Sequence, residues 1–210
     1  MLIGGIMSSF DYKAFYYDQN PMHIERAQKV ADSIKLSCNI DKNHVIADFG
    51  CGTGLLGLQF TPLVRQIDMI DNSPKMLQVL DDKIKKLDLK NVNTVFLDLD
   101  SCSNLPLSKY DIIMTLMTFH HIKDIKKAIF QLSQMLKKDG KLVICDLDEE
   151  DGSYHSDGNT IHNGINQEIL KNYAIYSKLN FITSKIPYII KKEIDGNNKS
   201  YPVFMHIYGK

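Results

Sequence analysis

The chain has 210 residues, of which 44% are hydrophobic, and this is enough to bury one sizeable core. Lysine plus arginine and aspartate plus glutamate number 25 each, so no global charge favours nucleic acid or an anionic membrane as a partner. The four cysteines lack the spacing of a metal site or a disulfide framework. We therefore expect a single domain, 1–210, of a cytoplasmic protein that contacts neither nucleic acid nor membrane.

An aromatic-rich segment comes first and leads into a helix. Asn20 stands directly before Pro21, and such a pair is typical of a helix start, with a capping side chain ahead of a proline at the first helical position. We expect residues 1–40 to form a helical cap. The aromatic side chains before the helix could form a lid over a ligand or pack the helix on the core, and these are Phe10, Tyr12, Phe15 and Tyr16.

Five apolar runs of strand length follow, with segments of helical spacing between them. Ser73-Pro74 predicts the start of one of these helices, and Gly140 is read as the stop of the helix that comes after residue 121. Strands that alternate with helices predict parallel strands joined by right-handed crossovers in one open sheet. The five runs span 44–49, 64–70, 92–97, 110–117 and 141–147.

The alternation ends beyond residue 147. A helix is expected around 165–179, and two further apolar runs are separated only by the turn-forming sequence DGNNKS, residues 195–200. Two strands joined in this way form an antiparallel hairpin. We expect this hairpin to close one edge of the sheet.

The stretch IADFGCGTGLLG, residues 46–57, fits two different nucleotide-binding loops. A GxGxxG spacing begins at Gly52, and Asp71 lies 19 residues later, where an acid could hold the ribose of NAD. The same stretch also reads DxGxGxG from Asp48, which puts a carboxylate beside the place of a doubly negative pyrophosphate. A ligand with an ammonium and a sulfonium but no phosphate suits that carboxylate better, and S-adenosylmethionine is such a ligand.

Five segments in chain order resemble the class I S-adenosylmethionine-dependent methyltransferases: ADFGCGTGLLG, MIDNSPKML, FLDLDS, YDIIMTLMTFHHIKD and LKKDGKLVICDLDEEDGSYH. The resemblance covers nearly the whole chain, and its nearest relatives are in the ubiquinone-biosynthesis-like small-molecule branch. It implies a Rossmann-like α/β fold with a seven-stranded sheet, mostly parallel, whose last strand is antiparallel. This agrees with the hairpin inferred above, and it implies S-adenosylmethionine as cofactor and a small-molecule acceptor.

The resemblance also implies cofactor-binding residues. Asp48 would lie near the amino group of the cofactor, and Asp71 would accept both ribose hydroxyls, although it could instead cap the next helix. Asp98 would accept from the adenine amino group, with Asp100 as a rival because DLD offers both. The complete expected set is Asp48, Gly50, Cys51, Gly52, Gly54, Asp71, Asn72, Met76, Asp98, Leu99 and Leu116.

Catalytic residues are harder to predict, because methyl transfer from a sulfonium is an in-line displacement that requires no fixed triad. His120 follows the fourth strand and could be a base or could fix its loop. His155 and His162 lie in the polar loop after the fifth strand, at the edge of the sheet where ligands of open α/β folds bind. We expect His155 or His162 to orient or deprotonate the acceptor.

The chain accordingly divides into the cap, a cofactor-binding core over 41–147, and an acceptor side over 148–210. Asp148, His155 and His162 are acceptable metal ligands without metal spacing, so no metal is expected. Two other functions share the sequence pattern: an NAD-linked oxidoreductase, and a non-catalytic cofactor-binding subunit. The fold alone cannot separate the three functions. The protein is expected to be a monomer or a homodimer.

Overall fold

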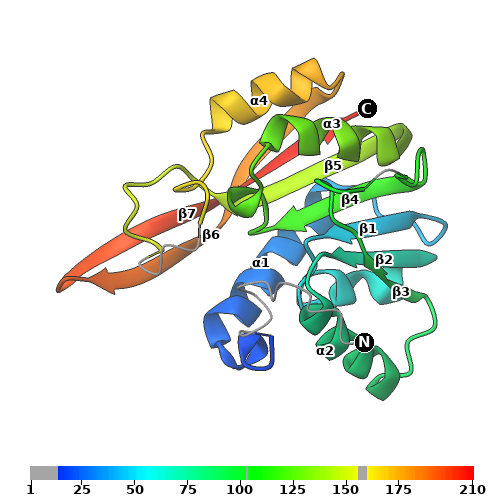
Figure 1. Cartoon of the computed structure of the whole chain (residues 1–210), viewed down its shortest axis with the longest axis horizontal. Helices are drawn as coiled ribbons and strands as arrows, with labels where there is room; N and C mark the ends of the chain where they lie inside the picture. Colours follow the sequence, from blue (N-terminus) through cyan, green and yellow to red (C-terminus); the bar gives the residue numbers. More distant parts are fainter. Residues whose placement is uncertain (1–13, 103, 156–159) are drawn as a thin grey trace, which may run out of the picture.

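The computed structural model describes residues 14–102, 104–155 and 160–210. It contains one seven-stranded sheet in the order β3-β2-β1-β4-β5-β7-β6 (Figure 1). β7 is antiparallel to both of its neighbours and every other pair is parallel, which confirms the predicted fold. The strands are β1 Val45–Phe49, β2 Gln66–Asp71, β3 Val92–Phe96, β4 Tyr110–Leu116, β5 Leu136–Leu147, β6 Asn180–Ile194 and β7 Asn197–Gly209.

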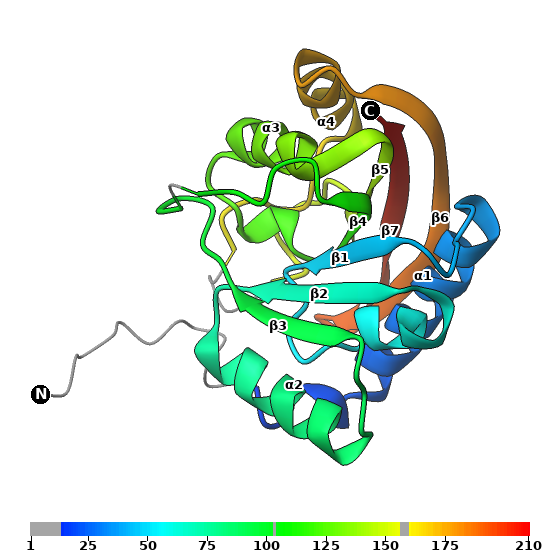
Figure 2. The same ribbon diagram turned by 90° about the vertical axis from the view of Figure 1, so that its right-hand side faces the viewer.

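Helices cover both faces of this sheet (Figure 2). Apolar side chains of α3 and α4 join one core layer, and those of α1, α2 and the 3-10 helix η2 join the other. The strand residues Ile46 and Ala47 belong to opposite layers, as the two-residue period of a strand requires. The helices are η1 Tyr17–Gln19, α1 Pro21–Ser37, η2 Gly57–Leu63, α2 Pro74–Lys86, η3 Phe119–His121, α3 Ile125–Met135 and α4 Gln167–Tyr176.

The predicted helix starts are confirmed by their capping bonds. The Asn20 side chain accepts from the Met22 N–H at 3.0 Å, and the Ser73 side chain accepts from the Met76 N–H at 3.2 Å. A proline occupies the first turn in both helices. Local chemistry thus determines where α1 and α2 begin.

The C-terminal hairpin turns within two residues, fewer than the six-residue stretch that was predicted. Asp195 and Gly196 have φ angles of 50° and 75°, and a tight hairpin turn of this kind needs positive φ at both positions. From Tyr188 to Ile194, β6 pairs with β7 without a register shift up to the turn. The far end of the hairpin projects beyond the rest of the sheet (Figure 1).

The helix that follows the glycine loop is the 3-10 helix η2, which contains Pro62. The predicted helix stop at Gly140 is wrong. The helix α3 ends at Met135, and Leu136 is already extended and pairs with Tyr110. Gly140 therefore lies inside β5, where a Cβ atom would come within 3.1 Å of the Tyr110 carbonyl oxygen. The small size of Gly140 allows the backbones of β4 and β5 to approach closely, and the residue does not end a helix.

The segment before α1 is described only from residue 14, so Phe10 and Tyr12 lie outside the described residues. Phe15 and Tyr16 are 60% and 69% exposed, so they do not pack the helix on the core. Among the described residues, no helix is both long and apolar enough to cross a membrane.

Candidate active site

A cavity of about 350 Å³ opens at the carboxyl ends of β1, β2 and β4. The strand order reverses between β1 and β4, and this is where open α/β sheets bind ligands. Ten of the eleven predicted cofactor-binding residues line the cavity, and only Gly54 does not: Asp48, Gly50, Cys51, Gly52, Asp71, Asn72, Met76, Asp98, Leu99 and Leu116.

The glycines of the loop have different physical roles. Gly50 has a φ of 71°, and a Cβ atom there would lie 2.3 Å from side-chain atoms of Thr118. Gly54 has a φ of 85°, and its Cβ would lie 2.6 Å from Leu80 of α2. Gly50 therefore lets β1 and β4 meet beneath the cavity, whereas Gly54 lets the loop pack on α2 and does not border the ligand space.

Asp48 is buried at the floor of the loop. Its carboxylate accepts the Gly57 N–H at 2.9 Å, and a side chain at Gly57 would strike that same carboxylate. The pKa of Asp48 is raised to about 7, mainly by burial. The hydrogen bond from Gly57 lowers this pKa in part, and the negative charge of Asp71 raises it further. A cation placed in the cavity would favour the ionised form.

Asp71 connects the glycine loop to α2. Its two carboxylate oxygens accept the Gly52 N–H at 2.7 Å and the Ser73 N–H at 2.8 Å. Ser73, and not Asp71, provides the cap of α2. Asp71 lines the cavity as well, so its carboxylate lies between the loop that it fixes and the ligand space.

Asp98 and Asp100 both line the cavity, and their surroundings differ. The carboxylate of Asp98 accepts the Asp100 N–H at 3.0 Å and the Ser101 hydroxyl at 2.9 Å. Asp100 is exposed and lies 3.9 Å from the Lys127 ammonium. Asp98 is held rigidly by its own turn, while Asp100 is open to solvent, and the adenine contact stays a prediction for either.

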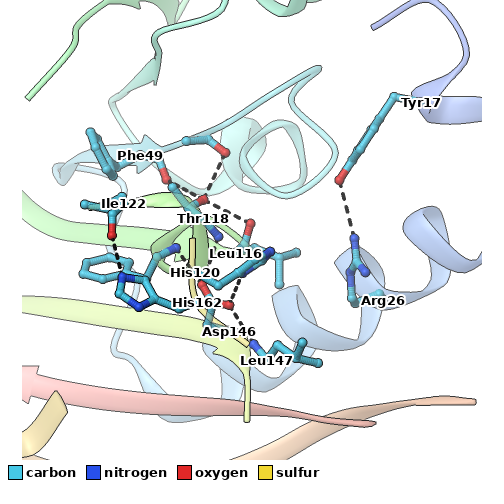
Figure 3. A network of polar contacts seen from close by, with 12 residues as sticks. Tyr17, Arg26, Phe49, Leu116, Thr118, His120, Ile122, Asp146, Leu147 and His162 are labelled. Atoms are coloured by element: carbon cyan, nitrogen blue, oxygen red, sulfur yellow. Dashed lines mark hydrogen bonds and ion pairs between the residues drawn. The ribbon is translucent and has the colours of Figure 1, made fainter. Parts of the chain in front are cut away.

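Asp146 at the end of β5 holds the loop that follows β4 (Figure 3). It accepts the backbone N–H groups of Thr118 at 3.0 Å and Phe119 at 2.7 Å. Its other carboxylate oxygen lies 2.5 Å from Nδ1 of His120. Burial alone would raise the pKa of Asp146, but the charge and hydrogen bond of His120 together with the backbone bonds keep it below its ordinary value.

Of the predicted catalytic histidines, His120 and His155 lie in one cluster and His162 lies apart from it. His120 is 1% exposed and does not line the cavity, and within the described chain its Nε2 has no hydrogen-bond partner. His121 does line the cavity, and its ring centre is 4.0 Å from that of His120. His155 lies 5.2 Å from the His120 ring, so these three imidazoles form one cluster.

His162 is placed apart from this cluster. Its Nε2 donates to the Ile122 carbonyl at 2.9 Å (Figure 3), and its backbone N–H donates to the His120 carbonyl at 3.1 Å. It lines a neighbouring cavity of about 850 Å³ between the starts of α3 and α4, not the one at the glycine loop. These bonds give His162 the geometry of a residue that holds two loops together.

The N-terminal segment contributes cavity residues that the sequence pattern did not identify. Tyr17, His23 and Arg26 line the cavity opposite the end of β4. Asp18 fixes this segment to the glycine loop, since it accepts the Thr53 hydroxyl at 2.6 Å and forms an ion pair with Lys83. The residue spacing of α1 indicates only a helix face that packs on the core. The burial of the charged residue Arg26 on that face points to a site, and this burial is seen only in the structure.

The loop after β5 forms a wall together with the hairpin. Ser153 hydrogen-bonds to the Tyr201 hydroxyl at 2.6 Å, and Asp151 pairs with Lys199 at 2.8 Å. A small apolar cluster beneath these contacts reaches Leu116 at the cavity. The loop and the hairpin therefore pack together as one unit, and the acceptor side expected over 148–210 stays a prediction. Over residues 14–102, 104–155 and 160–210 no group of three potential ligands is arranged to hold a metal ion.

Comparisons with known proteins agree with this geometry. Residues 46–140 match a family described as "Methyltransferase domain". An uncharacterized methyltransferase of Schizosaccharomyces pombe is 34% identical over 116 residues, which are 52% of this chain and 41% of that protein. The ubiquinone biosynthesis O-methyltransferase of Pelagibacter ubique is 33% identical over 54% of this chain and 46% of its own length. The chain thus spans less than half the length of either curated relative.

A solved structure shows the same fold over almost the whole chain. The structure described as an SAM-dependent methyltransferase from Aquifex aeolicus superposes with a TM-score of 0.70 at 18% identity, covering 95% of this chain and 97% of that one. The narrower resemblance to the ubiquinone branch stays a prediction. Residues 46–140 thus match a methyltransferase family, and the chain as a whole has the fold of a solved S-adenosylmethionine-dependent methyltransferase.

Proposed function

We propose that the protein transfers the methyl group of S-adenosylmethionine to a small-molecule acceptor bound in the same cavity. The observation that carries the proposal is that the carboxylate of Asp48, the glycine loop and His121 of the histidine cluster line one cavity of about 350 Å³. This volume is in the range of small-ligand sites. The balanced charge of the chain supports a small acceptor over a nucleic acid.

Two carboxylates at the cavity fit the ammonium and the ribose of this cofactor. Asp48 is buried beside the loop and would interact with the cofactor ammonium, a contact that favours the ionised carboxylate. Asp71 would accept the ribose hydroxyls while it holds Gly52 in place. A pyrophosphate would face the same two carboxylates, and like charge disfavours it, so NAD is the weaker candidate.

When bound, the cofactor supplies a methyl carbon attached to a positive sulfur. The acceptor atom forms its bond to that carbon as the carbon–sulfur bond breaks, and the electron pair of the broken bond stays on sulfur. The chain has to align the acceptor, exclude water and receive any proton that the acceptor loses. The left-handed backbone at Met117, with a φ of 56°, turns the end of β4 so that Leu116, Met117 and Thr118 all line the cavity.

His120 is the proposed proton acceptor, and Asp146 is its positioning residue. A carboxylate accepts hydrogen bonds, so the bond to Asp146 assigns the proton to Nδ1 and leaves the lone pair on Nε2. Because His121 lines the cavity and His120 does not, proton transfer to Nε2 would run through the adjacent imidazole of His121. A charge formed on the ring is stabilised by the buried carboxylate.

Binding and turnover are tested separately. Calorimetry of the purified protein should detect S-adenosylmethionine and S-adenosylhomocysteine but not NAD. Incubation of cell extract with the protein and methyl-labelled cofactor, followed by mass spectrometry, should find label in a small molecule. Binding of NAD at micromolar concentration without binding of the sulfonium compound would contradict the proposal, as would label that appears only in macromolecules.

The proton-transfer step has its own variants. His120→Asn should lower turnover by about 10²-fold or more, while cofactor affinity stays the same. Asp146→Asn should reproduce the loss in weaker form. His162→Gln is the matched control, because its Nε2 is already bonded to the Ile122 carbonyl, and a loss of threefold or less is expected. A large loss in His155→Gln or His162→Gln with none in His120→Asn would move the base to the loop after β5.

A further inference from the structure

The cavity of about 850 Å³ between the starts of α3 and α4, here called the second cavity, adjoins the cavity at the glycine loop. The two cavities share three lining residues, which are Asp100, Lys123 and Ile161. The first cavity, of about 350 Å³, is at the small end of the range of small-ligand sites, and the proposed cofactor would fill much of it. The body of an acceptor therefore needs the space that adjoins it.

One wall of the second cavity is tied to the loop that carries the histidine cluster. The Ile161 N–H donates to the His120 carbonyl at 3.3 Å, and the Ile165 N–H donates to the Leu147 carbonyl at the end of β5 at 2.9 Å. Residues 161–165 are thus held at both ends by backbone hydrogen bonds. A ligand that packs on this wall would lie at a fixed position relative to the proposed proton acceptor.

Apolar side chains form a continuous part of this lining. Ile165 and Leu170 are buried beneath the second cavity, whereas Ile161 is 55% exposed and Ile169 is 49% exposed. Large apolar side chains that stay exposed in a concave site indicate a surface that a ligand covers. The apolar lining residues are Ile125, Ile161, Ile165, Ile169, Leu170 and Tyr173.

Charged side chains at the second cavity interact with other groups of the chain. The Lys126 ammonium lies 3.8 Å from the centre of the Tyr176 ring, and the Asp124 side chain caps α3. The Glu149 carboxylate accepts the Asn166 amide at 2.9 Å. Lysines and carboxylates both occur along the lining, so neither sign of ligand charge is favoured. The lining therefore suits an uncharged ligand that covers the isoleucines.

We propose that the second cavity holds the body of the methyl acceptor, and that this body is an uncharged apolar chain or ring system. The atom that receives the methyl group would lie in the first cavity near the end of β4. The apolar body would extend from there past Ile161 to Ile169 of α4. The inference rests on the proposed function for the reaction and on the second cavity for the class of acceptor.

A binding test compares probes that share an apolar body and differ in charge. 4-Phenylbutan-1-ol, 4-phenylbutylamine and 4-phenylbutanoate are each titrated into the full chain by NMR. The alcohol should bind saturably and about fivefold more tightly than either charged compound. Ile169→Asn should weaken the alcohol by about five- to tenfold, because it replaces an apolar contact with a polar one. Ile175→Asn is the matched control, since Ile175 lies on the same helix, is 63% exposed and does not line the second cavity.

A turnover test uses the products labelled in cell extract, which should carry an uncharged apolar body. For such an acceptor, Ile169→Asn should raise KM about tenfold with little change in kcat, and its affinity for S-adenosylhomocysteine should match that of the wild type. Labelled products whose bodies are charged would contradict the inference.

The probe titration can also overturn the inference by itself. It does so if the alcohol does not bind the wild type, if a charged compound binds more tightly, or if Ile169→Asn binds the alcohol as well as the wild type. An equal loss in Ile175→Asn would show that the probe does not select the second cavity, and the inference would fail in the same way. If the protein neither binds S-adenosylhomocysteine nor labels any product, the proposed function has failed, and the titration still decides whether the second cavity binds an apolar ligand.

Discussion

The pH dependence of cofactor affinity should follow the ionisation of Asp48. Burial raises the pKa of this carboxyl from 3.8 to about 7, so near pH 6 the ligand-free protein holds mostly the neutral acid. A cofactor ammonium favours the carboxylate, and binding below pH 7 must therefore release a proton. From this pKa, affinity should rise by about an order of magnitude between pH 5.5 and pH 7 and then level off.

The same shift has a consequence for stability. Between about pH 4 and pH 7 the folded protein keeps a proton on Asp48 that the unfolded chain has released, so this group makes folding less favourable as pH rises. Above pH 7 the ionised carboxylate opposes folding by up to about 4 kcal/mol. Asp48→Asn should therefore raise the unfolding midpoint of the ligand-free protein at pH 8 by several degrees while it weakens the cofactor.

Calorimetry in buffers of different ionisation enthalpy measures both the affinity and the protons released. Wild-type protein at pH 6 should release close to one proton per cofactor bound, and Asp48→Asn should release almost none. Below pH 7 the free cofactor amine is almost fully protonated, so it does not account for the effect. The reasoning fails if the dissociation constant of wild-type protein is flat from pH 5.5 to pH 7, or if Asp48→Asn keeps the wild-type slope.

Three further results are expected. Asp71→Ala should weaken the cofactor by about 1.5–3 kcal/mol in calorimetry while the protein still melts cooperatively, and an unchanged affinity would leave Asp71 as only the link from the loop to α2. Gly50→Ala should lower the melting temperature clearly, because its Cβ would meet Thr118 at a positive φ; a wild-type melting curve would show that the loop can move aside. Burial lowers the pKa of His206 to about 4, so protonation of the unfolded chain below pH 6.5 should remove about 2 kcal/mol of stability between pH 7 and pH 5, and His206→Gln should flatten that slope in thermal unfolding.

The sheet could be predicted from sequence because its signals are local and repeated. Each parallel strand is a short apolar run between breakers, and both Asn20-Pro21 and Ser73-Pro74 carry their own capping chemistry. The prediction of a helix stop at Gly140 was wrong for a physical reason. A glycine after lysines resembles a helix stop, but here it is needed where β4 and β5 approach backbone to backbone, and only the paired strand reveals that constraint.

The site was predictable only in part. The cofactor loop can be recognised from contiguous residues, because a carboxylate and three glycines lie within seven positions of the sequence. Arg26 and Tyr17 reach the cavity because the N-terminal segment packs beside the glycine loop, and no spacing along the chain encodes that tertiary contact. The division between His120, which is buried against Asp146, and His121, which lines the cavity, follows from the turn of η3 and not from residue type.

The loop after β5 is anchored on the β6–β7 hairpin. Loop and hairpin together can therefore change in evolution independently of the cofactor-binding core. The segment that matches the methyltransferase family ends at residue 140, before the loop and the hairpin begin. If residues 148–155 alone were moved into a relative, Asp151 and Ser153 would lose their partners Lys199 and Tyr201. We therefore predict that the loop and its hairpin change together between relatives, and that a chimera that moves both would carry a new acceptor preference onto an unchanged cofactor-binding core.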